Sequence, residues 1–163
     1  MKQTEKIRNK ILNWEEATLL AQDAKKNGKS IIFTNGCFDL LHPGHLHVLG
    51  AAKDLGDILI VGLNSDESVK TLKGPDRPVM NESSRAILLA GLEMVDYVVI
   101  FTEETPLNLI REINPNIIVK GGDYAADEIV GSAHVEAYGG EVVTIPLLEG
   151  FSTTGIIRKS KPQ

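Results

Sequence analysis

Residues 34–45, Thr-Asn-Gly-Cys-Phe-Asp-Leu-Leu-His-Pro-Gly-His, follow the apolar run Ile31-Ile32-Phe33. Such a run is typical of a buried strand, and Pro43 suits the first position of a helix, where its missing N–H is not needed. The stretch is therefore expected to lead from the carboxyl end of a strand into a helix, which is where open α/β sheets bind ligands. A helix start also favours anions, because its N–H groups are free and the helix dipole is positive there.

Two histidines, His42 and His45, occupy this predicted helix start. Because they are three residues apart, they share one face of the first turn. A pair of imidazoles at a phosphate-binding helix start can stabilise charge that builds up on a reacting phosphoryl group. A zinc site is the alternative, but two histidines without a nearby cysteine or third histidine are a poor ligand set. We therefore predict a catalytic role for both histidines and no protein-bound metal.

Apolar runs alternate with amphipathic stretches along the rest of the chain. The expected strands are 30–35, 57–63, 97–101, 116–119 and 141–145. The expected helices are 14–26, 43–54, 66–72, 81–92, 106–113, 127–138 and 153–159. This alternation predicts an α/β fold with a five-stranded parallel sheet, helices on both faces, and strand 30–35 at the centre. We expect a single domain over residues 1–163, in which residues 1–12 form a helix or a loose arm.

Composition limits the function classes. The chain has 163 residues, of which 42% are hydrophobic and 24% charged, as in an ordinary globular protein. Its net charge of -5 argues against broad attraction to nucleic acid or to an anionic membrane. Cys37 is the single cysteine, which excludes an internal disulfide and fits the reducing cytoplasm. Residues 1–10 are polar and charged, so no signal peptide is expected, and no apolar run is long enough to span a membrane.

Further anion-binding groups follow other expected elements. Lys73 and Arg77 belong to a loop rich in glycine and proline that could close over reacting groups, although a plain solvated loop is the alternative. Ser152, Thr153 and Thr154 offer hydroxyl and N–H groups at the last helix start, where simple capping is the alternative. These two segments extend the predicted phosphate site beyond the histidines.

The segment after strand 116–119 reads Lys120-Gly121-Gly122-Asp123. Its glycines permit close approach of a ligand, and Asp123 could hold a ribose, a sugar hydroxyl or a metal-bound water, but a tight turn explains the pattern equally well.

We interpret two other residues as structural. Thr105 is expected to cap the helix 106–113, and Arg85 is interpreted as a surface cation.

The Gly-x-Phe-Asp and His-x-Gly-His pattern of residues 36–45 resembles the nucleotidylyltransferase superfamily. Residues 64–66, 72–79, 119–124 and 149–154 sharpen this into a resemblance to the adenylyltransferase domain of bacterial ADP-heptose synthase, which covers about residues 13–160. The resemblance implies a Rossmann-like doubly wound fold. It also implies transfer of AMP from ATP to D-glycero-β-D-manno-heptose 1-phosphate, usually with Mg²⁺, giving ADP-heptose for a lipopolysaccharide core or surface glycan.

The same resemblance assigns roles to residues. His42 and His45 correspond to the catalytic pair, Lys73 to a catalytic lysine that contacts the phosphates, Gly36, Phe38 and Asp39 to the nucleotide-side turn, and Ser152, Thr153 and Thr154 to phosphate contacts. From their places beside these motifs we also predict Arg77 as a substrate-phosphate contact, and Asn35, Cys37, Gly44, Lys120, Gly122 and Asp123 as nucleotide-binding residues. Related glycerol-phosphate cytidylyltransferases begin the segment 147–154 with arginine. Leu147 stands there in this chain, which favours ATP over CTP.

Alternatives remain open at this stage. The chain could be a cytidylyltransferase, or an adenylyltransferase for glycerol 3-phosphate or another small phosphate, and a non-enzymatic nucleotide-binding regulatory module is the alternative outside enzymes. A phospho-receiver is disfavoured, because Asn-Gly-Cys follows strand 30–35 where a receiver has an acidic pair. We expect ATP and a sugar phosphate as partners, with no nucleic acid and no membrane, and leave a homo-oligomer open. Many heptose enzymes carry a fused sugar kinase, so a separate kinase is expected for that step.

Overall fold

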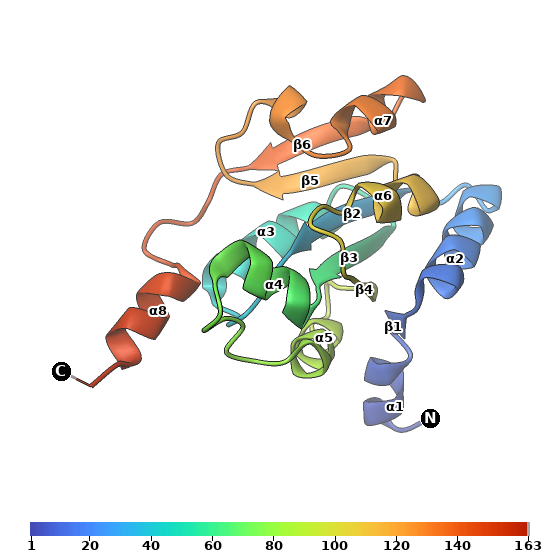
Figure 1. Ribbon diagram of the computed structural model, residues 1–163. Coiled ribbons are helices and arrows are strands. Elements are labelled where there is room, and N and C mark those ends of the chain that lie inside the picture. Colours follow the sequence, from blue (N-terminus) through green and yellow to red (C-terminus); the bar gives the residue numbers. More distant parts are fainter. Residues whose placement is uncertain (163) are drawn as a thin grey trace.

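A parallel sheet with helices on both faces forms the centre of the computed structural model, which describes residues 1–162 (Figure 1). The strands are β1 (Ile11–Leu12), β2 (Ile31–Gly36), β3 (Ile58–Asn64), β4 (Tyr97–Phe101), β5 (Ile117–Gly121) and β6 (Glu141–Ile145). The helices are α1 (Gln3–Arg8), α2 (Trp14–Lys26), α3 (Pro43–Lys53), α4 (Asp66–Lys73), α5 (Glu82–Ala90), α6 (Leu107–Ile113), α7 (Ser132–Ala137) and α8 (Thr153–Ser160), with the short 3₁₀ helix η1 (Ala126–Glu128).

The strand order, β1-β4-β3-β2-β5-β6, confirms that the strand before the histidines is central. From β2 the chain moves outward through β3 to β4, and then returns to place β5 on the other side of β2. This reversal leaves a crevice beyond the carboxyl ends of β2 and β5, which is the usual ligand site of such sheets.

The first dozen residues confirm the helix that was one of the two expectations, and add a strand that was not expected. They form α1 followed by β1, and β1 adds a sixth strand to the expected five by pairing with the edge of β4, Ile11 with Val98. A strand of two residues has no detectable periodicity, so only its sheet partner reveals it. The helix expected over 127–138 is also shorter, because Gly131 at φ +87° separates η1 from α7.

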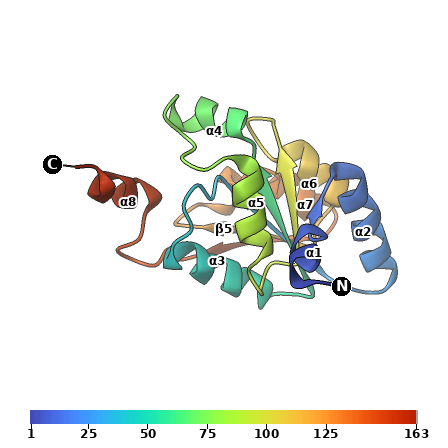
Figure 2. The ribbon, with the colours of Figure 1, turned by 90° about the horizontal axis from the view of Figure 1, so that it is seen from below.

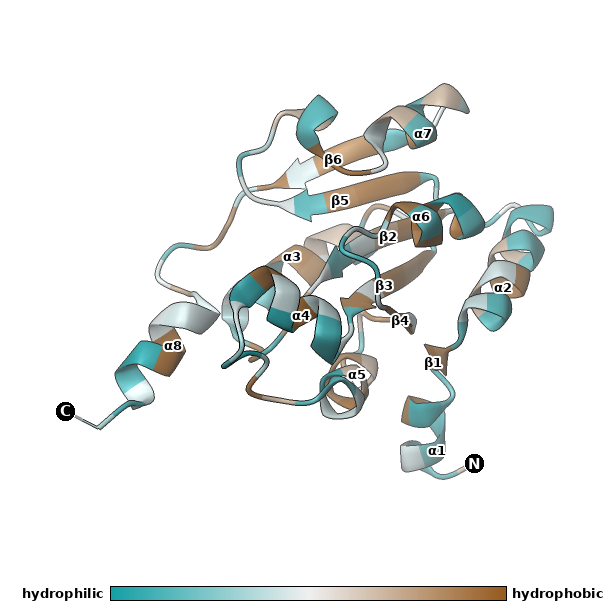
Figure 3. Cartoon of the chain, in the orientation of Figure 1, coloured by the Kyte–Doolittle hydropathy of each residue, from teal (hydrophilic) through white to brown (hydrophobic). Residues whose placement is uncertain are grey.

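Two apolar layers, one on each face of the sheet, make up the core. Successive β2 residues point to opposite faces: Ile31 and Phe33 pack beneath α2, α6 and α7, whereas Ile32 packs beneath α3 and α5. Figure 3 shows this arrangement: the strands inside are largely apolar, and polar residues lie on the outer faces of the helices. Among residues 1–162, no helix combines the length and the apolar character that crossing a membrane requires.

The last helix, α8, stands apart from this layered body. In both Figure 1 and Figure 2 it projects outward at the end of an extended segment, and none of its residues is buried. Its first residue is nevertheless anchored, because the Thr153 hydroxyl donates to the Leu40 carbonyl across 3.3 Å. That contact holds the start of α8 beside the turn that follows β2.

Candidate active site

A cleft of about 650 Å³ opens at the carboxyl edge of the sheet, a volume within the usual range for small-molecule sites. It receives residues from β2 and the turn after it, α3, α4, β5, and the segment before α8. The sequence-predicted residues that line it are Asn35, Gly36, Cys37, Phe38, Asp39, His42, Gly44, His45, Lys73, Arg77, Lys120, Ser152, Thr153 and Thr154. The fold thus brings together groups that are as many as 119 positions apart in the sequence, from Asn35 to Thr154.

Gly122 and Asp123 do not line this cleft. Gly122 adopts φ +120°, and its N–H donates to the Ile145 carbonyl across 2.8 Å, so the chain turns away after β5. Asp123 is exposed beyond that turn. The position of both residues therefore favours the tight turn that was the alternative interpretation of this glycine pair.

The two histidines lie face to face at the start of α3. Their ring centroids are 3.8 Å apart with an interplanar angle of 20°, and the Phe38 ring tilts against His45 at 5.1 Å. His42 is also the N-cap residue, and its carbonyl accepts the His45 N–H across 2.9 Å. Backbone and ring stacking therefore fix both imidazoles at the helix end that favours anions.

The Nδ1 atoms of His42 and His45 are buried and have no hydrogen-bond partner within residues 1–162. Burial lowers the pKa of His42, and burial followed by the charge of His42 lowers the pKa of His45 to about 4. Both rings are therefore neutral at pH 7 in the free protein. Unpaired buried polar atoms are costly, so the two Nδ1 atoms mark a site that the fold maintains against its own stability.

Gly44 leaves the space in which the His42 ring lies. A Cβ at position 44 would lie 2.9 Å from Cε1 of His42 and 3.3 Å from Cβ of Phe151. Both distances are below ordinary carbon–carbon contact. The glycine of the His-x-Gly-His pattern is thus required by the packing of the first histidine.

Asp39, which is buried, and Arg77, which is partly exposed, form an ion pair at the cleft wall. Arg77 donates its Nε–H to Asp39 across 2.6 Å, and the backbone N–H groups of Val79 and Met80 donate to the same carboxylate at 2.8 and 3.1 Å. Burial alone would raise the pKa of Asp39, but these hydrogen bonds outweigh it and the pKa lies below its ordinary value. Asp39 therefore holds the loop 74–80, and its oxygens are already engaged.

Arg85 is the clearest correction to the sequence analysis, since it is 1% exposed and not a surface cation. Its guanidinium donates to the carbonyls of Cys37, Asn64 and Met80 at 2.7, 2.8 and 2.9 Å. A fourth bond of 2.8 Å reaches the Asp66 carboxylate. Arg85 thus connects the carboxyl ends of β2 and β3 with α4 and the loop 74–80, which all border the cleft.

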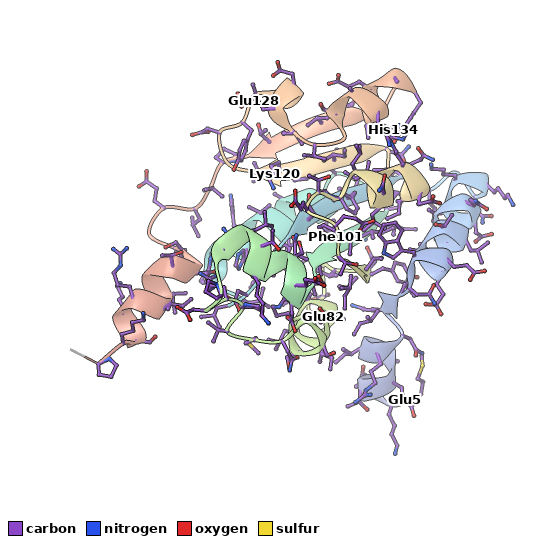
Figure 4. The ribbon with its side chains drawn as sticks, viewed as in Figure 1. Glu5, Glu82, Phe101, Lys120, Glu128 and His134 are labelled. Atoms are coloured by element: carbon purple, nitrogen blue, oxygen red, sulfur yellow. The ribbon has the colours of Figure 1, made fainter. Side chains whose placement is uncertain are left out.

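Two lysines face the cleft from opposite sides. Lys73 is the exposed last residue of α4, and Lys120 lies near the carboxyl end of β5, as Figure 4 shows. Burial lowers the pKa of Lys120. Together with Arg77 they place positive charge in the cleft, which favours anionic ligands.

The start of α8 supplies hydroxyl groups to the cleft. The Ser152 side chain caps the helix by accepting the Gly155 N–H across 3.0 Å, as the capping interpretation predicts. Thr154 is exposed beside it, and Thr153 holds Leu40 as described above. Capping and anion binding are compatible here, since the cap leaves other backbone N–H groups of the first turn unpaired.

Cys37 lines the cleft without the character of a nucleophile. Burial raises the pKa of its thiol, although Lys73, Arg85 and Arg77 oppose that shift. The thiol is therefore protonated at neutral pH, and Cys37 is a small packing residue of the cleft wall.

The sequence analysis did not assign cleft positions to Asn64, Glu104 and Thr105. Asn64 ends β3, and the other two follow β4. Thr105 does not cap α6, whose N-cap is Pro106. The signal was available, because all parallel strands present their carboxyl ends at one edge, and groups after β3 and β4 belong there as much as those after β2 and β5.

Comparison with known proteins agrees with this geometry. The family model for cytidylyltransferase-like proteins matches residues 33–159. The bifunctional protein HldE of Trichlorobacter lovleyi is 52% identical over 93% of this chain, and that of Nitrobacter winogradskyi is 57% identical over 83%. The chain spans 31% and 28% of the length of these two relatives.

Solved structures show the same fold. The lipopolysaccharide core biosynthesis protein of Thermoplasma volcanium is 31% identical with a TM-score of 0.61, and the match covers 74% of this chain and 98% of that one. Pantoate-beta-alanine ligase of Francisella tularensis, complexed with an ATP compound and β-alanine, has a TM-score of 0.59 at 14% identity, over 90% of this chain and 75% of that one, and so shares the fold alone. With its nucleotide-type cleft, its stacked histidine pair and a family match over most of its length, this chain belongs to the cytidylyltransferase-like family.

Proposed function

We propose that this chain transfers AMP from ATP to D-glycero-β-D-manno-heptose 1-phosphate, releasing pyrophosphate and ADP-heptose in the cytoplasm. The observation that carries the proposal is the stacked pair of His42 and His45, whose rings line the cleft at a helix start. The identity to the HldE relatives and to a lipopolysaccharide core biosynthesis protein supports the sugar acceptor.

The reaction is a single in-line displacement. A phosphate oxygen of the sugar attacks the α-phosphorus of ATP, and a new P–O bond forms while the bond to the β-phosphate bridging oxygen breaks. The electron pair leaves with pyrophosphate, so no protein nucleophile and no general base are needed. The protein contributes positioning and charge stabilisation.

Several groups in the cleft have a role in that step. The neutral rings of His42 and His45 donate N–H hydrogen bonds to the α-phosphate oxygens, where charge develops. Lys73 and Arg77 hold the acceptor phosphate, and the first turn of α8 receives the outer phosphates of ATP. Asp39 acts indirectly, by holding Arg77 and its loop.

Mg²⁺ is expected to accompany ATP, and the described residues suit a metal carried by its substrate. Residues 1–162 contain no group of three or more His, Cys, Asp or Glu side chains that could hold a metal ion. Mg²⁺ commonly binds through substrate phosphates and retained water rather than an all-protein cage. When bound there it would neutralise charge on the triphosphate.

Pyrophosphate release tests the proposal. We expect rapid release with ATP and heptose 1-phosphate, and little with CTP and glycerol 3-phosphate, since Leu147 lines the cleft where the cytidylyltransferases carry arginine. The reverse preference would overturn the assignment in favour of a cytidylyltransferase.

Histidine variants separate the enzyme from a nucleotide-binding regulatory module. His42→Ala or His45→Ala should lower turnover about 100-fold or more while calorimetry still detects ATP binding. Unchanged turnover in both variants would remove their proposed role.

A further inference from the structure

Glu104 lies in the loop between β4 and α6 and lines the cleft at the carboxyl edge of the sheet. We infer that Glu104 accepts hydrogen bonds from the hydroxyl groups of the acceptor sugar, which makes the β4–α6 loop the sugar subsite. This inference rests on the proposed function and adds to it the residue that recognises the sugar portion of the acceptor.

Only two of the described residues that line the cleft are acidic, and they differ in their contacts. Asp39 is 2% exposed and is occupied by Arg77, Val79 and Met80. Glu104 is exposed, and its carboxylate makes no hydrogen bond or ion pair with residues 1–162 that would explain its presence. Asp39 therefore has a structural partner, whereas Glu104 is available to a ligand.

The chemistry of the cleft indicates which part of a ligand Glu104 contacts. Lys73, Arg77 and Lys120 favour the phosphate groups of a ligand, whereas the free carboxylate of Glu104 repels them, so Glu104 must face a part of the ligand that is not anionic. A carboxylate accepts hydrogen bonds and donates none, so its natural partners here are hydroxyl groups. A heptose phosphate offers several hydroxyl groups together with a phosphate, which matches an acid placed near cations.

The structure also links the loop that carries Glu104 to α4, the helix that ends in Lys73. The Asn64 side chain donates to Ser68 Oγ across 2.8 Å, and Ser68 in turn donates to the Glu103 carbonyl across 3.2 Å. Helix α4, which ends in Lys73, is thereby tied to the β4–α6 loop. One sugar phosphate can then contact Lys73 with its phosphate and Glu104 with its hydroxyls.

The opposite wall suits the nucleoside. There Val48 of α3, Gly121 at the end of β5, and Leu147 and Phe151 before α8 present apolar or backbone surface. A purine ring packs favourably against such a surface. With the base on that side, the β4–α6 loop remains for the acceptor.

Paired glutamine variants test the inference. We expect Glu104→Gln to raise KM for heptose 1-phosphate about tenfold, with KM for ATP unchanged, because a site built to bond hydroxyls loses a charged acceptor. Calorimetric titration of the sugar phosphate in the presence of α,β-methylene ATP should show the same loss. Glu103→Gln is the matched control, since its side chain is exposed outside the cleft and should leave both constants unchanged.

The outcomes distinguish this inference from the proposed function. If the unaltered chain releases no pyrophosphate with ATP and heptose 1-phosphate, the proposed function fails. If it does so but Glu104→Gln keeps KM for the sugar, the inference alone is overturned. A variant that instead raises the Mg²⁺ requirement or KM for ATP would assign Glu104 to the metal–nucleotide complex and would also overturn it.

Discussion

Arg77 reaches Asp39 through a single Nε–H···Oδ2 contact of 2.6 Å, and the Asp39 side chain is 1% exposed. The loop that carries Arg77 is fixed to the same carboxylate by the N–H groups of Val79 and Met80. Because Nε is used for this pair, the terminal amines of Arg77 remain for a phosphate in the cleft that it lines. We therefore expect Asp39 to act as a positioning residue for Arg77, the cation proposed to hold the acceptor phosphate.

A double-mutant cycle measures this coupling. Asp39→Asn and Arg77→Ala should each raise KM for the acceptor phosphate, because each change removes or misplaces the same guanidinium. The double variant should be no worse than Arg77→Ala, which corresponds to a coupling of about 1.5–3 kcal/mol for a charged hydrogen bond. Fully additive effects on kcat/KM would show that the two residues act independently.

His45 makes stability depend on pH in a defined window. Its pKa is lowered to about 4 from an ordinary 6.5. Between pH 4 and pH 6.5, the His45 side chain is therefore protonated in the unfolded chain and neutral in the folded protein. The free energy of unfolding should therefore fall as pH drops from 6.5 towards 4, with no further loss from this group below that. Urea unfolding at successive pH values checks the direction.

Two variants test whether His45 causes the loss of stability between pH 6.5 and pH 4. His45→Gln should remove this part of the loss, whereas His47→Gln, at an exposed position on the same helix, should retain it. Asp39 acts at lower pH than His45. Because its pKa is lowered in the folded protein, its charge stabilises the fold at pH values above the ordinary pKa of an aspartate, and that stabilisation is lost as the pH falls through the lowered pKa. An identical pH profile for the His45 variant and the unaltered chain would contradict the burial of that ring.

A glycine pair on α3 tests the packing of the histidines. Gly44→Ala places a Cβ 2.9 Å from the His42 ring, so we expect turnover to fall at least tenfold while the helix persists. Gly50→Ala is the control, because nothing lies within 4 Å of its added Cβ. That variant should keep full activity and gain about 0.5–1 kcal/mol from the better helix propensity of alanine. Equal activity in the two variants would show that the His42 ring tolerates displacement.

Arg85 should determine the stability of the cleft walls. Arg85→Lys keeps the charge but cannot reproduce a fork that bonds three carbonyls and Asp66, so it should cost about 3 kcal/mol or more in the free energy of unfolding. Arg111→Lys, at an exposed position on α6, should change stability by less than about 0.5 kcal/mol. Comparable unfolding midpoints for these variants would contradict the role assigned to Arg85.

Local patterns predicted much of this architecture. The continuous apolar runs gave five of the strands, and the central place of β2 followed from the turn that carries the histidines. Helix caps are equally local: Asn13 and Glu16 exchange the hydrogen bonds of a capping box at 2.9 and 2.8 Å. In each case the signal lies within a few residues of the element it specifies.

The remaining features depend on contacts distant in sequence. Arg85 resembles any helix-surface cation until the ends of β2 and β3 are seen to converge on it, and the two-residue strand β1 is defined by its pairing with β4. Asp39 likewise reads as a ligand contact until the loop 74–80 folds over it. No local pattern contains these partners, which lie about 20 to 90 positions away.

The most direct test of the account is a crystal structure of the chain with α,β-methylene ATP. The account predicts the α-phosphate at the start of α3, with its oxygens about 2.7–3.2 Å from ring nitrogens of both His42 and His45. A nucleotide bound with its α-phosphate away from both rings would contradict the account.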